Sequence, residues 1–392
     1  MTRRTRSDPD LPLIHTWLAG PLPKEVAAAL ARLRRLPDVR HVAVMPDVHL
    51  SCSFGHDVCV GTALATSRLL YPAAVGGDIG CGMAAIAFDA QGDLLHDAQN
   101  ARRLLDKLPK AVPVHRRPSP HSAFDILHSA FPPLSHPALE SIRRRDAAVQ
   151  FATLGRGNHF LEFQESQGPS DGGQLWLMLH TGSRALGQAI RDHHLTQAQT
   201  SKPLAALDVA TPAGQAYLSD LSFALGYADA SRRTIVDCVG ALIDDLFHVG
   251  AIPHTYFSCH HNHVRLEIHS GRALYVHRKG AIPAAADQPG IIPGSMNSPS
   301  FHTLGRGNPL SLNSSSHGAG RRLSRDQARR TISPHRLRHE LSGLCYNERL
   351  LPALRDEAPS AYKDITAVLR AQRDLTRTTR RLVPLVSYKG TG

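Results

Sequence analysis

Hydrophobic residues recur along the chain at two spacings, one typical of helices and one typical of strands. Apolar positions at helical spacing predict a helix over 23–36. Short apolar runs predict strands over 41–45, 58–65 and 84–88, and the first of these is expected to end at Pro46. The first part of the chain is therefore expected to mix helix and strand.

The second half of the chain continues this mixture. Residues 213–247 have a helical pattern, and after residue 322 we expect helices until a final strand near 382–388. Two of the central strands should form a hairpin that turns at Ser270–Gly271. The predicted central strands are 159–163, 174–179, 264–268 and 273–277.

Two regions interrupt the regular pattern. Residues 111–137 contain many prolines and are expected to form a loop-rich connection or an insertion. Residues 282–322 are rich in Gly, Ser, Asn and Pro, and a loop of this length is usually functional or disordered. With no internal repeat and no clear linker, the 392 residues are expected to form one intertwined α+β domain.

Composition adds a preference for polyanionic partners. The chain has 45 Lys and Arg against 33 Asp and Glu, a net charge of +12, which favours nucleic acid but also fits a merely basic surface. No apolar run approaches the roughly 18 residues of a membrane helix, and residues 1–10 lack a secretory signal. We therefore expect a cytoplasmic protein without a membrane partner.

Cysteine and histidine usage points to metal or nucleophile chemistry rather than disulfides. The six cysteines are scattered without a CxxC pair, which argues against a disulfide framework or a zinc ribbon. The chain has 24 histidines, several of them clustered. Asp78 and Cys81 lie in the Gly-rich segment 73–83, where a sharp turn would let both side chains share a divalent ion. The alternative is a tight turn with a structural Asp and a buried Cys.

Three further histidines are candidate ligands. His159 lies at a predicted strand, His180 ends an apolar strand, and His261 belongs to the cluster 259–263, where alternation turns it away from His260. Each has a structural alternative, such as a satisfied histidine in a half-buried strand. Cys and His together would suggest zinc first, and nothing in the spacing selects manganese.

The segment 314–321 is the most informative loop. His317 lies there among small residues, and a neutral imidazole can attack phosphorus and carry a phosphoryl group covalently. The alternative is a flexible turn. Arg184 could bind a phosphate through two N–H groups, unless its segment only begins the next helix. A 3-4-3 spacing predicts one basic stripe on a helix, more typical of a solvated face than of RNA contact, formed by Arg370, Arg373, Arg377 and Arg380.

Eight segments, in the same order along the chain, resemble the motifs of the RtcB family of RNA ligases. Their co-linearity makes the resemblance specific, and it extends from about residue 41 to the C-terminus, leaving 1–40 as a variable segment. The fold implied is a single RtcB-like domain with central β-sheets surrounded by helices. The segments are 45–50, 72–83, 157–162, 180–184, 261–262, 276–281, 293–296 and 316–321.

The resemblance implies a ligase that uses GTP and two manganese ions to join an RNA 3′-phosphate or 2′,3′-cyclic phosphate to a 5′-hydroxyl. His317 would carry GMP covalently, and Asp47 would orient it. Cys81 would bridge the two ions, one held also by Asp78 and His159, the other also by His180 and His261. Nucleotide contacts are implied for Asn158, Glu162, Ser295, Ser300, Ala319, Gly320, Tyr362 and Lys389, and RNA-phosphate contacts are suggested for Arg184 and Arg321.

The chain also departs from the family pattern. Residues 51–59 replace a small Gly-rich stretch, Arg156 replaces a small residue, His263 replaces an aromatic one, and 111–137 has no recognised counterpart. These departures question the substrate more than the chemistry. The alternatives are repair of damaged RNA instead of joining tRNA halves, action on DNA ends, a cyclic-phosphate phosphoesterase, and a non-catalytic RNA-binding protein. An archease-type activator is a possible partner.

Overall fold

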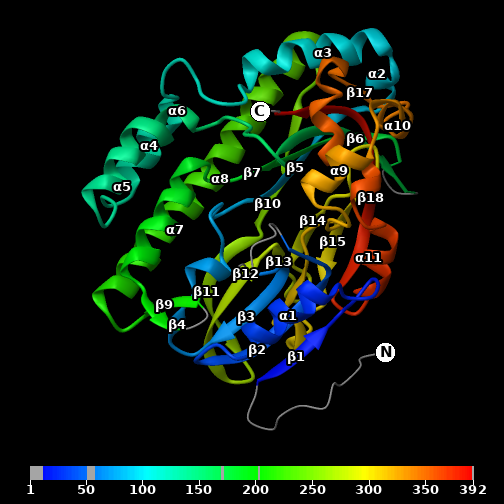
Figure 1. The fold of residues 1–392 in the computed structure, drawn as a ribbon. Helices are drawn as coiled ribbons and strands as arrows, with labels where there is room; N and C mark the ends of the chain where they lie inside the picture. Colours follow the sequence, from blue (N-terminus) through cyan, green and yellow to red (C-terminus); the bar gives the residue numbers. More distant parts are fainter. Residues whose placement is uncertain (1–11, 51–57, 169–171, 202–203, 391–392) are drawn as a thin grey trace.

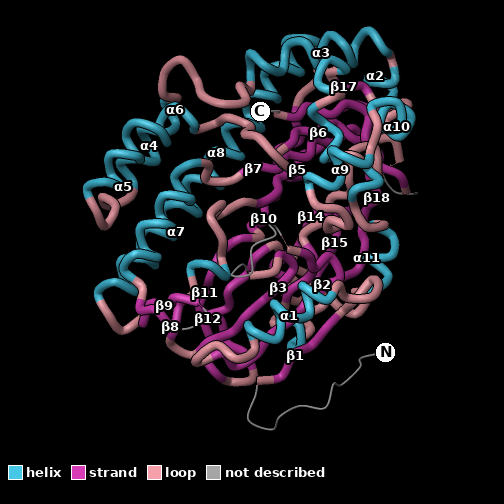
Figure 2. Tube along the Cα trace, viewed as in Figure 1, coloured by secondary structure: helices cyan, strands magenta, loops and turns pink. Residues whose placement is uncertain are grey.

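Two large β-sheets form the centre of the molecule, and the helices surround them (Figure 1). The computed structural model describes residues 12–50, 58–168, 172–201 and 204–390. Figure 2 shows the helices gathered on the outside and the strands in the middle. The predicted fold class, α+β with central sheets surrounded by helices, is confirmed, whereas the extent of a single domain over 1–392 stays a prediction.

The five-stranded sheet carries the first part of the site. Its hairpin turns at Ser270 and Gly271, which both have positive φ, as a two-residue type I′ turn requires. The helix α1 (Lys24–Leu33) covers this sheet with buried Val26 and Leu30. The strands, in sheet order, are β1 (Leu13–Thr16), β2 (Val39–His49), β3 (Val60–Thr66), β12 (Arg272–Lys279) and β11 (Asn262–His269).

The second large sheet has eight strands and is mostly antiparallel. Only β17 (Cys345–Tyr346) pairs in parallel, with β18 (Thr376–Lys389). In sheet order, the other strands beside β18 are β10 (Ala251–His260), β5 (Gly82–Gln91), β7 (Gln174–Thr181), β6 (Phe160–Gln167), β15 (Ser300–Gly305) and β14 (Pro289–Ile292). Two small sheets are separate from these. One has three strands in the order β4 (Leu69–Leu70), β9 (Leu204–Asp208) and β8 (Gln199–Ser201), and the other pairs β13 (Ala281–Pro283) with β16 (Ser314–Ser316).

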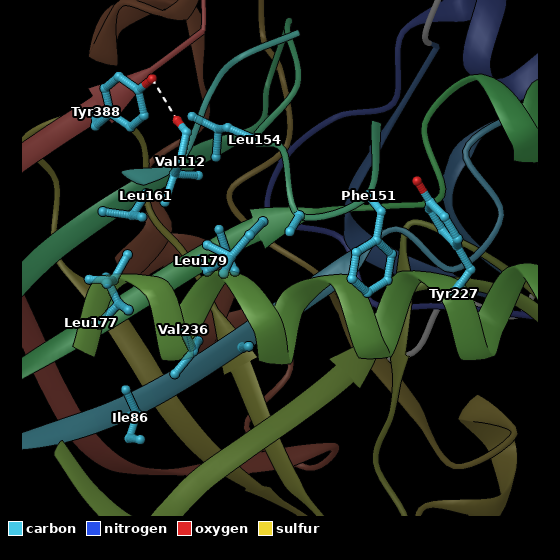
Figure 3. Packing of buried hydrophobic residues seen from close by; sticks show 14 of the residues in the cluster. Ile86, Val112, Phe151, Leu154, Leu161, Leu177, Leu179, Tyr227, Val236 and Tyr388 are labelled. Carbon is cyan, nitrogen blue, oxygen red and sulfur yellow. Dashed lines mark hydrogen bonds between the residues drawn. The ribbon is translucent and has the colours of Figure 1, made fainter. Parts of the chain in front are cut away.

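The long helix α8 (Pro212–Phe247) packs on the eight-stranded sheet and builds the main core. Figure 3 shows its Val236 near Ile86 and Leu177 of that sheet, and its Tyr227 beside Phe151. In the part of the chain that the structure describes, no helix is long and apolar enough to cross a membrane. The remaining helices are α2 (Asp93–His96), α3 (Ala98–Ala111), α4 (Ser122–Ala130), α5 (Pro137–Ile142), α6 (Ala148–Gln150), α7 (Ala185–Gln197), α9 (Arg325–Thr331), α10 (Pro334–Glu340) and α11 (Ile365–Ala371).

The proline-rich region 111–137 is not a loop throughout, because it contains α4. The prolines lie outside this helix, and buried Phe124 packs against Phe151 and Tyr227. The aromatic contacts of Phe124 therefore stabilise α4, a helix that the number of prolines in the region did not predict. Whether the region is an insertion stays a prediction.

Three further expectations from the sequence are wrong. The segment 282–322 is not a loop throughout, because it contains β14, β15 and β16. The strand β2 does not end at Pro46 but continues to His49; its pairing with β3 is irregular between Val44 and His49, so the missing N–H of proline is tolerated there. The four arginines do not form one helical stripe, because α11 ends at Ala371. Arg370 belongs to that helix, whereas Arg377 and Arg380 lie on strand β18.

Candidate active site

A pocket of about 310 Å³ is lined by residues from both large sheets. Polar motifs that lie far apart in the sequence meet at this pocket, because each motif is at the end of a strand or in a loop beside one. The predicted site residues that line it are Asp78, Cys81, Asn158, Glu162, His180, His261, Ser295, Ser300, His317, Ala319, Gly320, Arg321, Tyr362 and Lys389.

Thiol and imidazole groups converge at one side of this pocket. The Sγ of Cys81 lies 3.4 Å from Nε2 of His159 and 3.2 Å from Nε2 of His180. The same Nε2 of His180 is 3.4 Å from Nε2 of His261, and Nε2 of His159 is 2.9 Å from Oδ2 of Asp78. The five predicted ligands are thus brought together by the fold.

Strand pairing explains this convergence. Cys81 directly precedes β5, and β5 pairs with β7 so that Met83 lies opposite His180. On its other side β5 pairs with β10, which ends one residue before His261, and the N–H of His261 donates to the carbonyl of Cys81. Three ligands therefore meet at one end of three neighbouring strands.

The donor set fits a divalent cation. Burial lowers the pKa of both His180 and His261, which keeps the imidazoles in the neutral form that binds metal. Burial, together with Asp78, raises the pKa of the Cys81 thiol, and a nearby cation would reverse this by favouring the thiolate. The carbonyl of Asn158 lies 3.0 Å from Nδ1 of His180, which fixes the tautomer that leaves Nε2 as the ligand atom.

The described residues leave some polar atoms of this cluster unsatisfied. Oδ1 of Asp78 is buried and has no hydrogen-bond partner among them. The facing Nε2 atoms of His180 and His261 cannot both be lone-pair acceptors without a proton or a cation between them. Cys81, His159 and His180 have ligand atoms within 4.8 Å of one another, a spacing suited to one ion.

His317 and Asp47 form a second constellation beside this cluster. Oδ2 of the fully buried Asp47 accepts from the backbone N–H of His317 at 3.1 Å and lies 2.6 Å from its Nδ1. The ring centroids of His317 and His261 are 4.8 Å apart. Nζ of Lys363 donates to the carbonyls of Pro46 and Val48, on either side of Asp47. A fixed imidazole therefore borders the candidate metal centre.

Gly320 lets the loop of His317 approach β2 closely. Its φ is +72°, and a Cβ on it would lie 2.2 Å from the carbonyl oxygen of Asp47. Both the conformation and the contact require glycine. The backbone of this loop is thus pressed against the strand that holds Asp47.

Glu162, on β6, also lines the pocket. Burial raises the pKa of this carboxyl to about 7, although Gln164 donates a hydrogen bond to it at 2.7 Å. The Gln164 amide also donates to Ser300 Oγ at 3.2 Å. Glu162 is therefore a buried carboxyl group that, when ionised, can accept hydrogen bonds from the N–H groups of a ligand.

The sequence reasoning missed Glu357, whose carboxylate joins several side chains that line the pocket. Its carboxylate accepts from Lys389 at 2.9 Å, from Tyr362 at 2.8 Å and from Arg325 at 3.0 Å. Burial alone would raise its pKa, but the charges of Lys389, Arg325 and Arg321 outweigh burial and lower the pKa to about 2. No motif signals this residue, because its importance comes from contacts between distant segments.

The two arginines predicted for RNA phosphates occupy different surroundings. Arg321 lines the pocket, but its guanidinium donates to Tyr362 at 3.0 Å, to Glu357 at 3.3 Å and to nearby carbonyls. Arg184 is the N-cap of α7 with a φ of 62°, and it donates to the carbonyl of Val114 at 3.4 Å. Arg184 is not among the pocket-lining residues.

Comparison with known proteins shows the family to which the chain belongs. The family model described as "tRNA-splicing ligase RtcB" matches residues 29–130 and 125–390. The chain is 35% identical to "RNA-splicing ligase RtcB1" of Escherichia coli over 410 residues, which cover 96% of this chain and 97% of that protein. It is 31% identical to "RNA-splicing ligase RtcB" of Mycobacterium tuberculosis, over 90% of this chain and 97% of that protein. This chain therefore belongs to the RtcB family of RNA-splicing ligases.

Proposed function

We propose that this protein is a GTP- and manganese-dependent RNA ligase that joins an RNA 3′-phosphate, or a 2′,3′-cyclic phosphate after hydrolysis, to a 5′-hydroxyl. The observation that carries the proposal is the contact between buried Asp47 and His317 beside a thiol–imidazole cluster at one pocket. The membership of the RtcB family supports the reaction class. The proposed substrates are tRNA halves or cleaved RNA in the cytoplasm, with an archease-type activator as a possible partner.

The metal centre would be held by the five converging side chains. Asp78, Cys81 and His159 would bind one manganese ion, and Cys81, His180 and His261 the second. Bound divalent ions neutralise phosphate charge and orient the attacking and leaving groups. His180 is prepared for this role by its contact with the carbonyl of Asn158.

His317 would act as the nucleophile. With Asp47 accepting a hydrogen bond from Nδ1–H, the lone pair of Nε2 attacks the α-phosphorus of GTP. An N–P bond forms, and the bond to the β-phosphate oxygen breaks to release pyrophosphate. The negative charge of Asp47 stabilises the positive charge that develops on the ring.

Two further displacements would complete the reaction. An oxygen of the RNA 3′-phosphate attacks the guanylate phosphorus, and the N–P bond breaks to return neutral His317. The 5′-hydroxyl then attacks the activated 3′-phosphorus, loses its proton and displaces GMP. Arg184 and Arg321 are proposed to contact RNA phosphates. Arg321 already donates hydrogen bonds to several protein acceptors, so it would have to give up some of these bonds to bind a phosphate.

The guanine base would be read by groups on the Glu162 side of the pocket. Ionised Glu162 can accept from the N–H groups of the guanine edge, which adenine does not offer in the same arrangement. Lys389, positioned by Glu357, supplies a donor for a carbonyl oxygen. The other proposed nucleotide contacts are Asn158, Ser295, Ser300, Ala319, Gly320 and Tyr362, which all line the pocket.

A ligation assay tests the proposal. Purified protein is incubated with Mn²⁺, GTP and two RNAs, one with a labelled 3′-phosphate end and one with a 5′-hydroxyl, with and without an archease-type activator. We expect a joined product that requires both GTP and Mn²⁺. Hydrolysis of a cyclic phosphate without GTP use would identify a phosphoesterase instead. Salt-sensitive RNA binding that survives Asp78→Ala and Cys81→Ala, with no turnover, would identify a binding protein.

A further inference from the structure

Arg232, on α8, is one of the largest fully buried side chains in the molecule, and its exposed fraction is 0%. Its guanidinium makes five contacts. Nη1 donates to the carbonyl of Gly80 at 2.8 Å and to that of Thr181 at 3.0 Å. Nη2 lies 3.0 Å from Nδ1 of His260 and 3.3 Å from Asp229, and Nε donates to Ser258 Oγ at 3.0 Å.

These contacts fall beside three of the proposed metal ligands. Gly80 precedes Cys81, Thr181 follows His180, and His260 precedes His261. One guanidinium therefore joins the three segments that carry the bridging thiol and both imidazoles of the second proposed ion. The fork of donors on arginine is suited to this task, because a lysine ammonium cannot span three separated acceptors in the same plane.

The packing of α8 against the Cys81 loop supports the same relationship. Gly80 has a φ of +72°, and a Cβ on it would lie 2.9 Å from the Cβ of Ala228. Ala228 is four residues before Arg232, so the two face the same side of the helix. The helix thus approaches the loop as closely as glycine allows and then fixes it through Arg232.

The charge of Arg232 adds to its geometry. A buried cation without partners is costly, and the side chain of the nearby Asp229 is 53% exposed, so its compensation is partly screened. The donation of Arg232 to the carbonyls of Gly80 and Thr181 therefore contributes much of the compensation for burying this charge.

We infer that Arg232 is a positioning residue for the metal centre, setting the separation of Cys81, His180 and His261. The inference rests on the proposed function, because it assumes that these side chains hold metal. A purely structural role would be to attach α8 to β10. The two roles differ in a measurable way: only the first makes metal affinity in the folded protein depend on Arg232.

The test compares Arg232→Gln and Arg232→Lys with Arg233→Gln. Arg233 is the next residue of the same helix, but it is half-exposed and pairs with Asp237 instead of the ligand segments. Metal-free protein is titrated with Co²⁺, and the thiolate-to-cobalt absorption gives both affinity and coordination. The melting temperature of the metal-free protein is measured alongside.

We expect Arg232→Gln to lose about 10- to 100-fold in Co²⁺ affinity, as substitutions of residues that orient metal ligands typically do, and Arg232→Lys to lose less. Arg233→Gln should bind as the wild type does. Wild-type affinity and an unchanged absorption band in folded Arg232→Gln would overturn the inference while leaving the metal centre intact. If that variant does not fold, Arg232→Lys decides in the same way. A wild-type protein that binds no Co²⁺ would overturn the metal centre itself.

Discussion

Nδ1 of His317 lies 2.6 Å from Oδ2 of Asp47, a residue 270 positions earlier in the chain. The same carboxylate oxygen also accepts the backbone N–H of His317, so both the ring and the main chain are fixed by one group. The pairing determines the tautomer, since a proton shared at Nδ1 leaves the lone pair on Nε2. This relationship distinguishes His317 from the other histidines of the cluster and supports its proposed role as the nucleophile.

Asp47→Asn should keep the shape of this contact and remove its charge. The amide can donate to Nδ1 and stabilise the wrong tautomer, and a comparable change in serine proteases lowers the rate by about 10⁴-fold. We expect guanylylation in a single turnover to slow by a factor on the order of 10²–10⁴. Exposed Asp89→Asn serves as the control. A rate within threefold of wild type (about 0.6 kcal/mol in the barrier) would show that Asp47 does not orient the nucleophile.

Gly320→Ala and Gly343→Ala separate a steric clash from backbone strain. Both glycines have positive φ, +72° and +87°, but a Cβ at Gly343 would meet nothing within 4 Å, whereas one at Gly320 would overlap the Asp47 carbonyl. We expect Gly343→Ala to cost about 1–2 kcal/mol of stability with guanylylation unchanged. Gly320→Ala should lose stability and also guanylylation. If the two variants had equal unfolding free energies and equal guanylylation rates, the close approach of the Gly320 loop to Asp47 would be refuted.

Nucleotide affinity should depend on pH through Glu162. Burial raises its pKa to about 7, so the free protein holds a proton there between the unfolded value near 4.5 and about pH 7. Guanine N–H groups favour the ionised carboxylate, so GTP binding should release this proton and strengthen as pH rises from about 5.5 to 8. Calorimetry in two buffers measures both quantities. Glu162→Gln should bind weakly at every pH, and a wild-type affinity independent of pH would contradict this role.

The same shift has a consequence for stability, with a definite sign. Because the folded protein binds more protons than the unfolded chain between about pH 4.5 and 7, Glu162 opposes folding increasingly as pH rises through that window. Glu162→Gln should therefore gain stability relative to wild type at pH 8 and not at pH 4. Urea unfolding at both pH values provides the comparison.

Glu357→Gln should destabilise the folded protein around the pocket. The carboxylate neutralises Lys389 in a buried setting, and removing one partner of a buried ion pair typically costs about 3–5 kcal/mol. The pKa, lowered to about 2 by Lys389, Arg325 and Arg321 against the effect of burial, implies that the stabilisation is present above pH 4.5 and is lost as pH falls towards 2. Exposed Glu348→Gln is the matched control, and equal unfolding midpoints for the two variants at pH 7 would contradict the assignment.

The sequence predicted the candidate ligands because short local motifs mark them. Asp78, Cys81, His180 and His261 stand at strand ends or in loops beside strands, where short motifs with glycine and polar residues mark the site directly. The fold brings these ligands together, as expected. Their roles toward metal and nucleotide remain predictions.

The parts that the sequence did not reveal depend on contacts between distant segments. The role of Glu357 depends on contacts with Lys389 and Tyr362. The role of Arg232 depends on contacts with residues at the ends of three different strands, so neither residue has a local sequence signature. The helix α4 was hidden by the prolines around it, because its stability comes from Phe124 in an aromatic cluster. In each case tertiary packing supplies what local pattern lacks.

The most direct test of the proposed mechanism is covalent labelling of His317. Wild-type protein and His317→Ala are incubated with Mn²⁺ and GTP labelled at the α-phosphate, with EDTA and γ-labelled GTP as controls, and separated on a denaturing gel. We expect a labelled wild-type band only with the α-label and only without EDTA, and none for His317→Ala. A wild-type band that persists in His317→Ala, or no wild-type band with fresh Mn²⁺ and an activator present, would contradict a guanylylated His317.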